Sequence, residues 1–363
     1  MPKFKKIETS QRHTQKQPHS TVTVYIHALV EAGRDGIDEL SIRQKLVNHK
    51  TKCTVDRSVG LMRKDMQVEF KNSLGYVMLE MPNDLFDELT GEFKSNVKKM
   101  FQFVLEQVYT QAFRGGELTQ DTVTFSGHEL VDIGLYSDER ASERGFNSAM
   151  SILTSIKVKG EIRYKPNMKP LYIHSLTVMF HRVERREAEF TVFLNSHIDW
   201  NFIIYFFSHI PLYYYELSAR AASLCYQVFY LARQHTADIK ERGRFTISLK
   251  AVRNALSIPL RATKQAKRDI VNEFFRAVDE LEAAHRTHFH NEDLELFIIN
   301  CDDTMPPAQF IEAINKGGAA LEVNISGELA KPFIEFEELK AKRLKEAIAK
   351  RKAKTRKNAD NPK

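Results

Sequence analysis

Apolar residues recur along the chain in one order that occurs three times. In the first occurrence, helical spacing predicts a helix from 21 to the stop at Gly33, a short helix over 40–47 and a third helix from Thr54. Two alternating segments, 68–70 and 76–79, follow and are joined by a polar turn. Three helices followed by a hairpin is the order typical of a winged helix-turn-helix. The apolar face of the expected third helix is Val55, Val59, Met62 and Met66.

The second and third occurrences resemble copies of each other. Segments 107–109 and 227–229 stand near the ends of matching helices, and the short strands 123–126 and 245–248 each end in a serine that can cap the next helix. Second helices are expected over 128–135 and 250–258, and hairpins over 162–178 and 287–299. The third helices are marked by two apolar stripes: Phe146, Ala149, Met150, Leu153 and Ile156 in one copy, and Val271, Phe274, Phe275, Val278 and Leu281 in the other.

These patterns predict an α+β, helix-rich fold of three tandem winged-helix modules with flexible basic tails. The expected division is a tail over 1–20, modules over 21–82, 83–190 and 191–301, a linker with little core over 302–336 and a second tail over 337–363. Segment 335–352 could form a charged helix. The dense apolar segment 200–215 fits a domain or subunit interface better than a ligand pocket.

The positive charge is concentrated at the two ends of the sequence. The net charge is +7, of which residues 1–20 contribute +4 and residues 340–363 contribute +9, so the segment between them is slightly acidic. Such runs attract nucleic-acid phosphates without reading sequence, although they also serve simply to keep a protein soluble. A device that reads DNA sequence must therefore lie between the tails.

The outward faces of the three expected third helices carry donors suited to DNA. Arginine can bond guanine, and asparagine or glutamine can bond adenine, through two hydrogen bonds in the major groove. Asn147 and Asn272 fall at the same place in the two copies. The candidate DNA-binding residues on these faces are Arg57 and Lys64, then Arg140, Arg144 and Asn147, and then Arg261, Gln265, Arg268, Asn272 and Arg276.

The expected hairpin of the middle module is strongly basic. It would suit phosphate contact or entry into the minor groove, and lysines on an exposed strand edge also prevent edge-to-edge pairing. Its basic residues are Lys157, Lys159, Arg163, Lys165 and Lys169.

Between about 95 and 300 the chain resembles the plasmid replication initiators built from two winged-helix domains, the iteron-binding, theta-type family. The resemblance is a pattern of apolar positions with a few identities, and it leaves the N-terminal module and residues 302–363 uncovered. The residues that carry it are 123–135 (VTFSGHELVDIGL), 148–153, 176–183, 190–195, 213–230 and 245–249.

The resemblance implies a DNA-binding protein that acts at repeated origin sites, helps to open an adjacent A·T-rich segment and recruits the host helicase and chromosomal initiator. It also implies that the second winged helix reads the major groove through Arg268, Asn272 and Arg276, that Arg140, Arg144 and Asn147 contact the other part of the repeat, and that the first winged helix forms a homodimer that represses its own gene. A winged-helix transcriptional regulator is the alternative that the same modules allow.

Enzyme signatures are weak. The chain has no G-x-x-x-x-G-K-[ST] and no G-x-S-x-G, so we expect no catalytic residue, cofactor or metal. The tract His285–His290 allows a nicking initiator or relaxase with a His-apolar-His metal site on a strand, with Tyr213, Tyr214, Tyr215, Tyr226 or Tyr230 as the nucleophile. Three distant cysteines, no apolar leader and no long apolar run indicate a cytoplasmic protein without a membrane partner. The resemblance implies that it is bacterial and associated with the nucleoid or a plasmid.

Overall fold

The computed structural model confirms an α+β fold rich in helix. The strands of the described residues form five sheets, and helices lie at the centre of the molecule. The structure describes residues 14–18, 21–33, 51–60, 64–114, 117–163, 169–204, 207–250, 264–300, 306–316, 320–325 and 327–359. The α-helices are α1 (Thr21–Ala32), α3 (Asn83–Asp87), α4 (Gly91–Gln107), α5 (Gly127–Asp132), α6 (Glu139–Ser155), α7 (Asn201–Ile204), α8 (Ala219–Ala232), α9 (Thr236–Arg242), α10 (Lys264–Phe289), α11 (Pro307–Lys316) and α12 (Gly327–Ala359).

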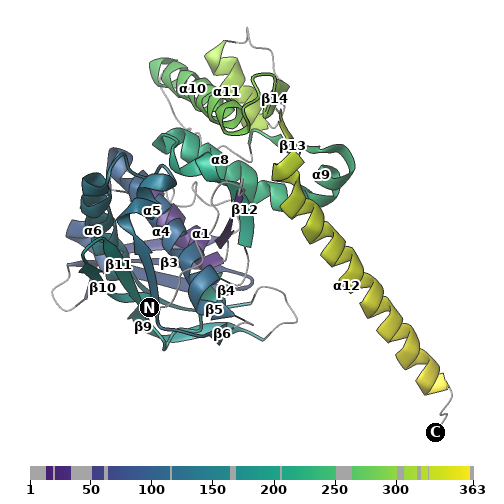
Figure 1. Ribbon diagram of the computed structural model, residues 1–363, viewed down its shortest axis with the longest axis horizontal. Coiled ribbons are helices and arrows are strands. Elements are labelled where there is room, and N and C mark those ends of the chain that lie inside the picture. Colours follow the sequence, from purple (N-terminus) through teal and green to yellow (C-terminus); the bar gives the residue numbers. More distant parts are fainter. Residues whose placement is uncertain are drawn as a thin grey trace.

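The strands are short, and most of them pair antiparallel with a neighbour in sequence. They are β1 (Thr14–Pro18), β2 (Lys52–Val59), β3 (Asp65–Asn72), β4 (Gly75–Pro82), β5 (Phe113–Arg114), β6 (Glu117–Leu118), β7 (Thr122–Ser126), β8 (Lys157–Ile162), β9 (Leu171–Val178), β10 (Phe180–Arg186), β11 (Glu189–Leu194), β12 (Phe207–Pro211), β13 (Arg244–Ser248), β14 (Phe297–Asn300) and β15 (Ala320–Asn324). Helices α4 and α8 lie in the middle of the molecule, with α10 on one side and strands β3 and β4 on the other (Figure 1).

Two three-stranded sheets have the same topology. In one the strand order is β10–β11–β7, and in the other it is β14–β15–β13, so in each the last strand in sequence lies between the other two. In each case a helix precedes the first strand, and a long helix, α6 or α10, stands between the first strand and the last two. The duplication expected from sequence is therefore present in the order and pairing of the elements.

The N-terminal half of the first copy follows its sequence signals closely. Ser126 accepts a hydrogen bond from the backbone N–H of Glu129 at 3.1 Å, and the Glu129 carboxylate accepts one from the backbone N–H of Ser126 at 2.6 Å, so α5 begins with a capping box. The predicted stripe of α6 is buried, and the Phe146 ring stacks on Phe190 of β11 with centroids 4.1 Å apart. This packing fixes which side of α6 faces outward.

The predicted third helix of the N-terminal module is wrong, because residues 52–59 form strand β2. Its alternate residues Cys53 and Val55 pair in register with Phe70 and Val68 of β3. The hairpin that follows is confirmed as β3 and β4, and β4 then pairs with β8, giving a five-stranded sheet of order β2–β3–β4–β8–β9. The sheet therefore contains strands from both sides of the module boundary expected between residues 82 and 83. The second helix expected over 40–47 lies outside the described residues.

Two expectations, one for the second copy and one for the linker, also differ from the structure. Residues 287–289 end α10, so 287–299 is not a hairpin; β14 pairs instead with β15 from the expected linker. That segment contributes buried Phe310, Leu321 and Val323, because its apolar residues complete the sheet that contains β13. The second helix expected over 250–258 lies almost wholly outside the described residues.

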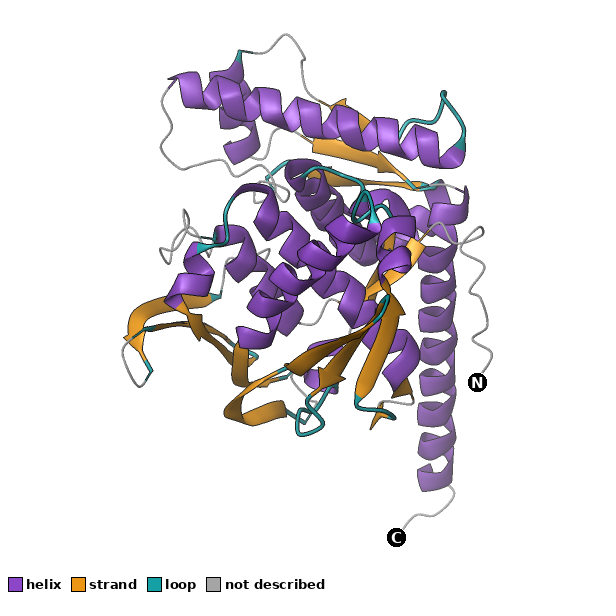
Figure 2. Cartoon of the chain, turned by 60° about the vertical axis from the view of Figure 1, so that its left-hand side comes forward, coloured by secondary structure: helices purple, strands orange, loops and turns teal. Residues whose placement is uncertain are grey.

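The two expected tails contain regular structure. Residues 14–18 form β1, which pairs with β12, and 337–359 continue α12, a single long helix that projects away from the body (Figures 1 and 2). Trp200, Phe202 and Tyr214 of the apolar segment 200–215 are buried. Helix α7 contacts α1 and β9, and residues 212–215 contact α8 and α10. These residues belong to the core of the described chain; the expectation that they form a domain or subunit interface stays a prediction.

Candidate nucleic-acid interface

Helix α6 presents a polar face opposite its buried stripe. Asp138 caps the helix by accepting a hydrogen bond from the backbone N–H of Ala141 at 2.8 Å, and this bond lowers the pKa of its carboxyl group. Since Phe146 and Met150 face the core, the side chains of Arg144 and Asn147 point away from it. The exposed polar residues of this face are Arg140, Arg144, Asn147, Ser148 and Ser151.

Helix α10 is built in the same way. Val271, Phe274 and Val278 are buried, and the opposite face exposes Arg268, Asn272 and Arg276, as expected from sequence. Gln265 is also exposed, but its amide donates to the Asp269 carboxylate at 2.8 Å, which occupies one of its donors. Arg261 lies outside the described residues.

Asn147 and Asn272 occupy equivalent positions in the two copies. Each directly follows the buried residue that begins the apolar stripe, Phe146 in α6 and Val271 in α10, and each is exposed. Because α6 and α10 occupy the same place in the order of elements of the two copies, each copy presents an asparagine side chain at the same position on an outward helical face.

A hairpin with three arginines and three glutamates, which the sequence reasoning missed, lies beside α6. Strands β10 and β11 pair through a turn at Glu187, a residue with a positive φ of 55°. Arg185 forms an ion pair with Glu143 of α6, and Arg182 lies over the Phe193 ring at 4.2 Å. Glu184 pairs with Arg182 at 2.9 Å and lies 3.9 Å from Arg186, whose side chain is 86% exposed. The sequence signal that could have indicated this hairpin is the group of three arginines within the seven residues of β10.

The hairpin expected over 162–178 is present as the antiparallel pair β8–β9, and it lies at the edge of the five-stranded sheet because β8 also pairs with β4. Lys157 forms a 2.8 Å ion pair with Glu80 and lies 3.7 Å from Asp65; the bond to Glu80 raises its pKa. Lys157 therefore stabilises the sheet, where two carboxylates lie close to its ammonium group. Lys159 lies on β8, which begins directly after α6, and exposed Arg163 follows that strand. Lys165 lies outside the described residues.

The N-terminal candidates do not lie on a helix. Arg57 is on β2, where its guanidinium donates to Asn83 at 2.8 Å and pairs with Asp87 at 2.9 Å. Lys64 precedes β3, and its backbone carbonyl accepts a hydrogen bond from Asn83. The expectation that both residues mark a third-helix face is wrong, because the segment pairs as a strand.

The histidine tract forms the end of α10, so the strand alternation expected for a metal site is absent. His285 is buried and lies 3.1 Å from the Tyr213 hydroxyl, and burial lowers its pKa to about 4. Burial raises the pKa of Tyr213 well above its usual value, which opposes its use as a phenolate nucleophile. Among the described residues no group of three His, Cys, Asp or Glu side chains could hold a metal ion.

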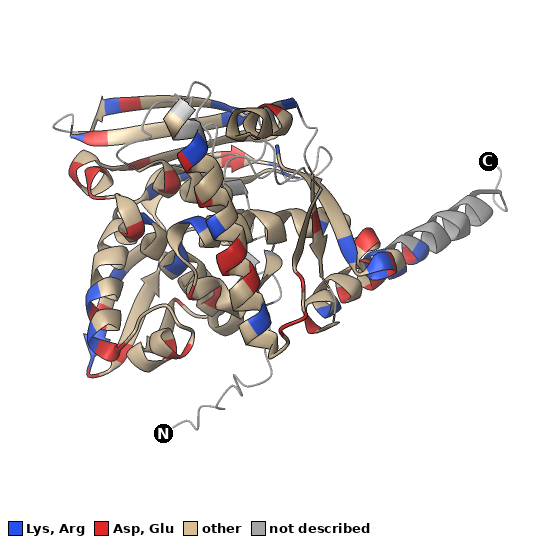
Figure 3. Cartoon of the chain, turned by 90° about the horizontal axis from the view of Figure 1, so that it is seen from above, with Lys and Arg blue, Asp and Glu red and all other residues tan. Residues whose placement is uncertain are grey.

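The charged side chains of the body are of mixed sign. Figure 3 shows Lys and Arg interspersed with Asp and Glu over the helices and strands. Salt bridges such as Arg220–Glu273 and Arg244–Glu322 neutralise part of the surface locally. No helix within the described ranges is long and apolar enough to cross a membrane.

Comparisons with known proteins give one structural match. No family model and no curated protein sequence matches the chain. Among solved structures, a crystal structure of the RctB domains 2-3 matches with a TM-score of 0.39 and 7% sequence identity, covering 74% of this chain and 93% of that chain. Similarity at that level does not establish a common fold.

Proposed function

We propose that residues 91–194 and 219–324 are two winged-helix units. The support is their shared sequence of helix, strand, long helix and two further strands, with the last strand in the middle of each sheet. In this assignment α6 and α10 are the recognition helices, and the strand pairs β10–β11 and β14–β15 are the wings. The first unit carries β8 and β9 as an insertion before its wing, and the second carries α11 within its wing.

The paired positions of Asn147 and Asn272 carry the proposal that these units read duplex DNA. A helix in the major groove must bury its apolar side in the protein and direct donors outward, and both helices meet that requirement. Asn272, with Arg268 and Arg276 one turn to either side, forms a donor ridge along α10 that fits base edges. Arg140 and Arg144 extend the corresponding ridge of α6.

The remaining cations suit the DNA backbone. Arg186 at the tip of the β10–β11 hairpin is positioned as a wing contact to phosphate or the minor groove. The C-terminal helix α12 carries most of the positive charge of 340–363 and can lie along a phosphate backbone without reading bases.

The resulting function is sequence-specific binding of double-stranded DNA by a replication initiator that performs no chemistry. It would bind repeated origin sites (iterons) on a plasmid, act in the bacterial cytoplasm, form a homodimer when repressing its own gene, and recruit the host helicase and chromosomal initiator. The resemblance of segments 123–135 and 213–230 to two-winged-helix initiators supports this choice over other winged-helix proteins.

A DNase I footprint of the purified chain on the DNA flanking its own gene tests the proposal. Protection of evenly spaced repeats is expected, and it should be lost in Asn272→Ala and retained in Lys240→Ala. Lys240 is an exposed lysine of α9, outside the proposed recognition helices and wings. Absence of any protected site would overturn the assignment. Cloning the gene with its flanking DNA then separates two roles: autonomous replication supports an initiator, whereas promoter repression without replication supports the transcriptional regulator.

A further inference from the structure

The outer face of the five-stranded sheet is a second polar and aromatic surface, separate from α6 and α10. One side of the sheet is buried through Phe70, Val77 and Val158. The alternate residues face the other side, since successive side chains of a strand point to opposite faces. One row across this face follows the strand register and consists of Lys52, Lys71, Tyr76, Glu161 and Tyr172.

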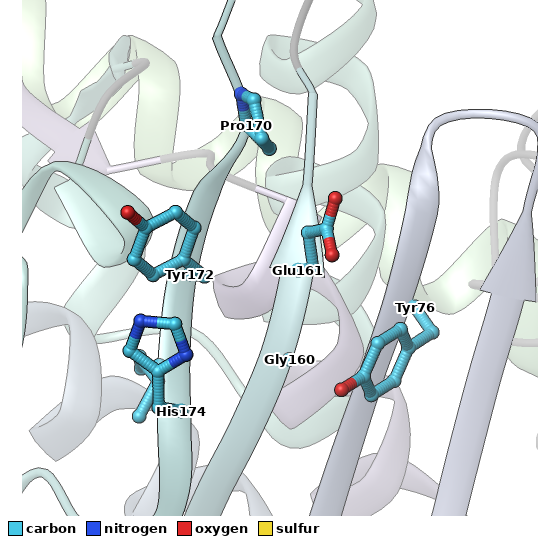
Figure 4. A pocket seen from close by; sticks show the side chains of 7 residues that line it. Tyr76, Gly160, Glu161, Pro170, Tyr172 and His174 are labelled. Atoms are coloured by element: carbon cyan, nitrogen blue, oxygen red, sulfur yellow. The ribbon is translucent and has the colours of Figure 1, made fainter.

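Aromatic rings are exposed at one end of this row. Tyr172 is the most exposed of the large apolar residues in the described chain, at 47%, and the centroid of its ring lies 4.2 Å from that of exposed His174. Tyr76, Glu161 and Pro170 complete a half-open pocket of about 260 Å³ with them (Figure 4). A pocket of that size, walled by rings from β4 and β9, can receive a flat aromatic group.

The geometry of the rings suits bases that are not paired. Tyr76 and Tyr172 lie two strands apart, about 10 Å, with Glu161 between them on β8. In a duplex the faces of the bases are hidden by stacking on one another, so only a single strand can offer them to protein rings. The Glu161 carboxylate repels phosphate but can accept a hydrogen bond from the amino group of a base.

Cations flank the rings where a backbone would run. Lys71 is the register partner of Tyr76, Lys159 stands two residues before Glu161 on the same face of β8, and exposed Lys169 precedes β9. An aromatic platform bordered by basic side chains is the arrangement by which proteins hold single-stranded nucleic acid without strong sequence preference.

We propose that this face of the sheet binds single-stranded DNA, with bases stacked on Tyr76 and on the Tyr172–His174 pair. The site goes beyond the duplex-reading function, because it uses other elements and other chemistry. Only the choice of DNA over RNA rests on that proposed function. A chain that holds a duplex through α6 and α10 could in this way also retain one strand once the two are separated.

Fluorescence anisotropy with labelled 15-nucleotide oligo(dC) and a labelled duplex tests the proposal on the full-length chain. Tyr172→Ala should weaken oligo(dC) binding by about tenfold or more, since a base stacked on an aromatic ring contributes that much to affinity. Tyr172→Phe, which keeps the ring, should bind within about twofold of the unmodified protein. Leu339→Ala is the matched control, because it removes an apolar side chain of similar exposure (44%) from α12.

Duplex binding separates this proposal from the previous one. Tyr172→Ala should leave duplex affinity unchanged, and Asn272→Ala should leave oligo(dC) affinity unchanged. Equal oligo(dC) binding by Tyr172→Ala and the unmodified protein would overturn the platform, whatever the duplex result. Tighter binding of an oligo(C) RNA, with the same sensitivity to Tyr172→Ala, would overturn the assignment to DNA.

Discussion

The ammonium group of Lys99 lies 2.8 Å from the backbone carbonyl oxygen of Tyr215, to which it donates a hydrogen bond. A second bond, of 2.5 Å, reaches the carbonyl of Leu217. Lys99 belongs to α4 of the first proposed winged-helix unit, whereas both carbonyls precede α8 of the second. Next to it, Lys98 forms an ion pair with Glu31 of α1 and donates to Ser223 of α8 at 2.8 Å. These buried lysines therefore tie the two copies to each other and to the N-terminal helix.

The buried position of Lys99 predicts a pH dependence of stability. Burial is the main cause that lowers its pKa to about 8, while Glu92 acts in the opposite direction. Between pH 8 and about 10.4 the unfolded chain then binds more protons at this residue than the folded chain, so its contribution to the free energy of unfolding rises with pH. The rise should be about 1.5 kcal/mol between pH 8 and 9.5.

Urea unfolding of the unmodified protein and of Lys99→Met at both pH values measures this effect. The difference in unfolding free energy between the two proteins should grow by that amount as the pH is raised, because all other titrating groups are shared. A difference that stays constant with pH would mean that Lys99 keeps an ordinary pKa.

Gly75 tests the five-stranded sheet. Its φ of 143° is unfavourable for other residues, and a Cβ atom there would lie 2.0 Å from the carbonyl oxygen of Glu161 on β8. Gly75→Ala should therefore destabilise the protein by roughly 2–4 kcal/mol. Gly91→Ala is the matched control: its φ is also positive, at 48°, but a Cβ there has nothing within 4 Å, so a cost of only about 1 kcal/mol is expected. Chemical denaturation gives both values, and equal costs would contradict the close approach of β4 and β8.

The proposed recognition helix predicts a loss of base preference. Arg268→Ala or Asn272→Ala should each weaken specific duplex binding by about 1–3 kcal/mol and relax discrimination at a single base-pair position. Competition assays against a set of singly substituted sites report both quantities. An equal loss of affinity for every substituted site would instead indicate that these side chains contact phosphates rather than bases.

The C-terminal helix predicts a contribution that is independent of sequence. Deleting residues 340–363 removes most of the basic part of α12 and should weaken binding to specific and unrelated duplexes alike. The slope of the logarithm of affinity against the logarithm of salt concentration should become shallower, as measured by titration at several salt concentrations. Loss confined to the specific site would show that α12 reads sequence.

The sequence determined the elements whose signals are local. Local signals predicted helices α5, α6 and α10 and the outward faces of α6 and α10, because contacts within a helix span only three or four residues. These signals are the apolar stripe at Phe146, Ala149 and Met150, the cap at Ser126 and the 3.6-residue period of α10. The placement of Asn147 and Asn272 on exposed faces followed directly from this.

Only the tertiary structure decided which strands pair. Val55 and Val59 satisfy helical and strand spacing alike, and β2 forms because its alternate residues can pair with β3, next to a sheet that also recruits β8. In the same way β14 takes its partner from residues 320–324, beyond α11, rather than from a nearby hairpin. The free energy of such pairing comes from contacts between residues far apart in the chain. A local hydrophobic period carries no information about those contacts.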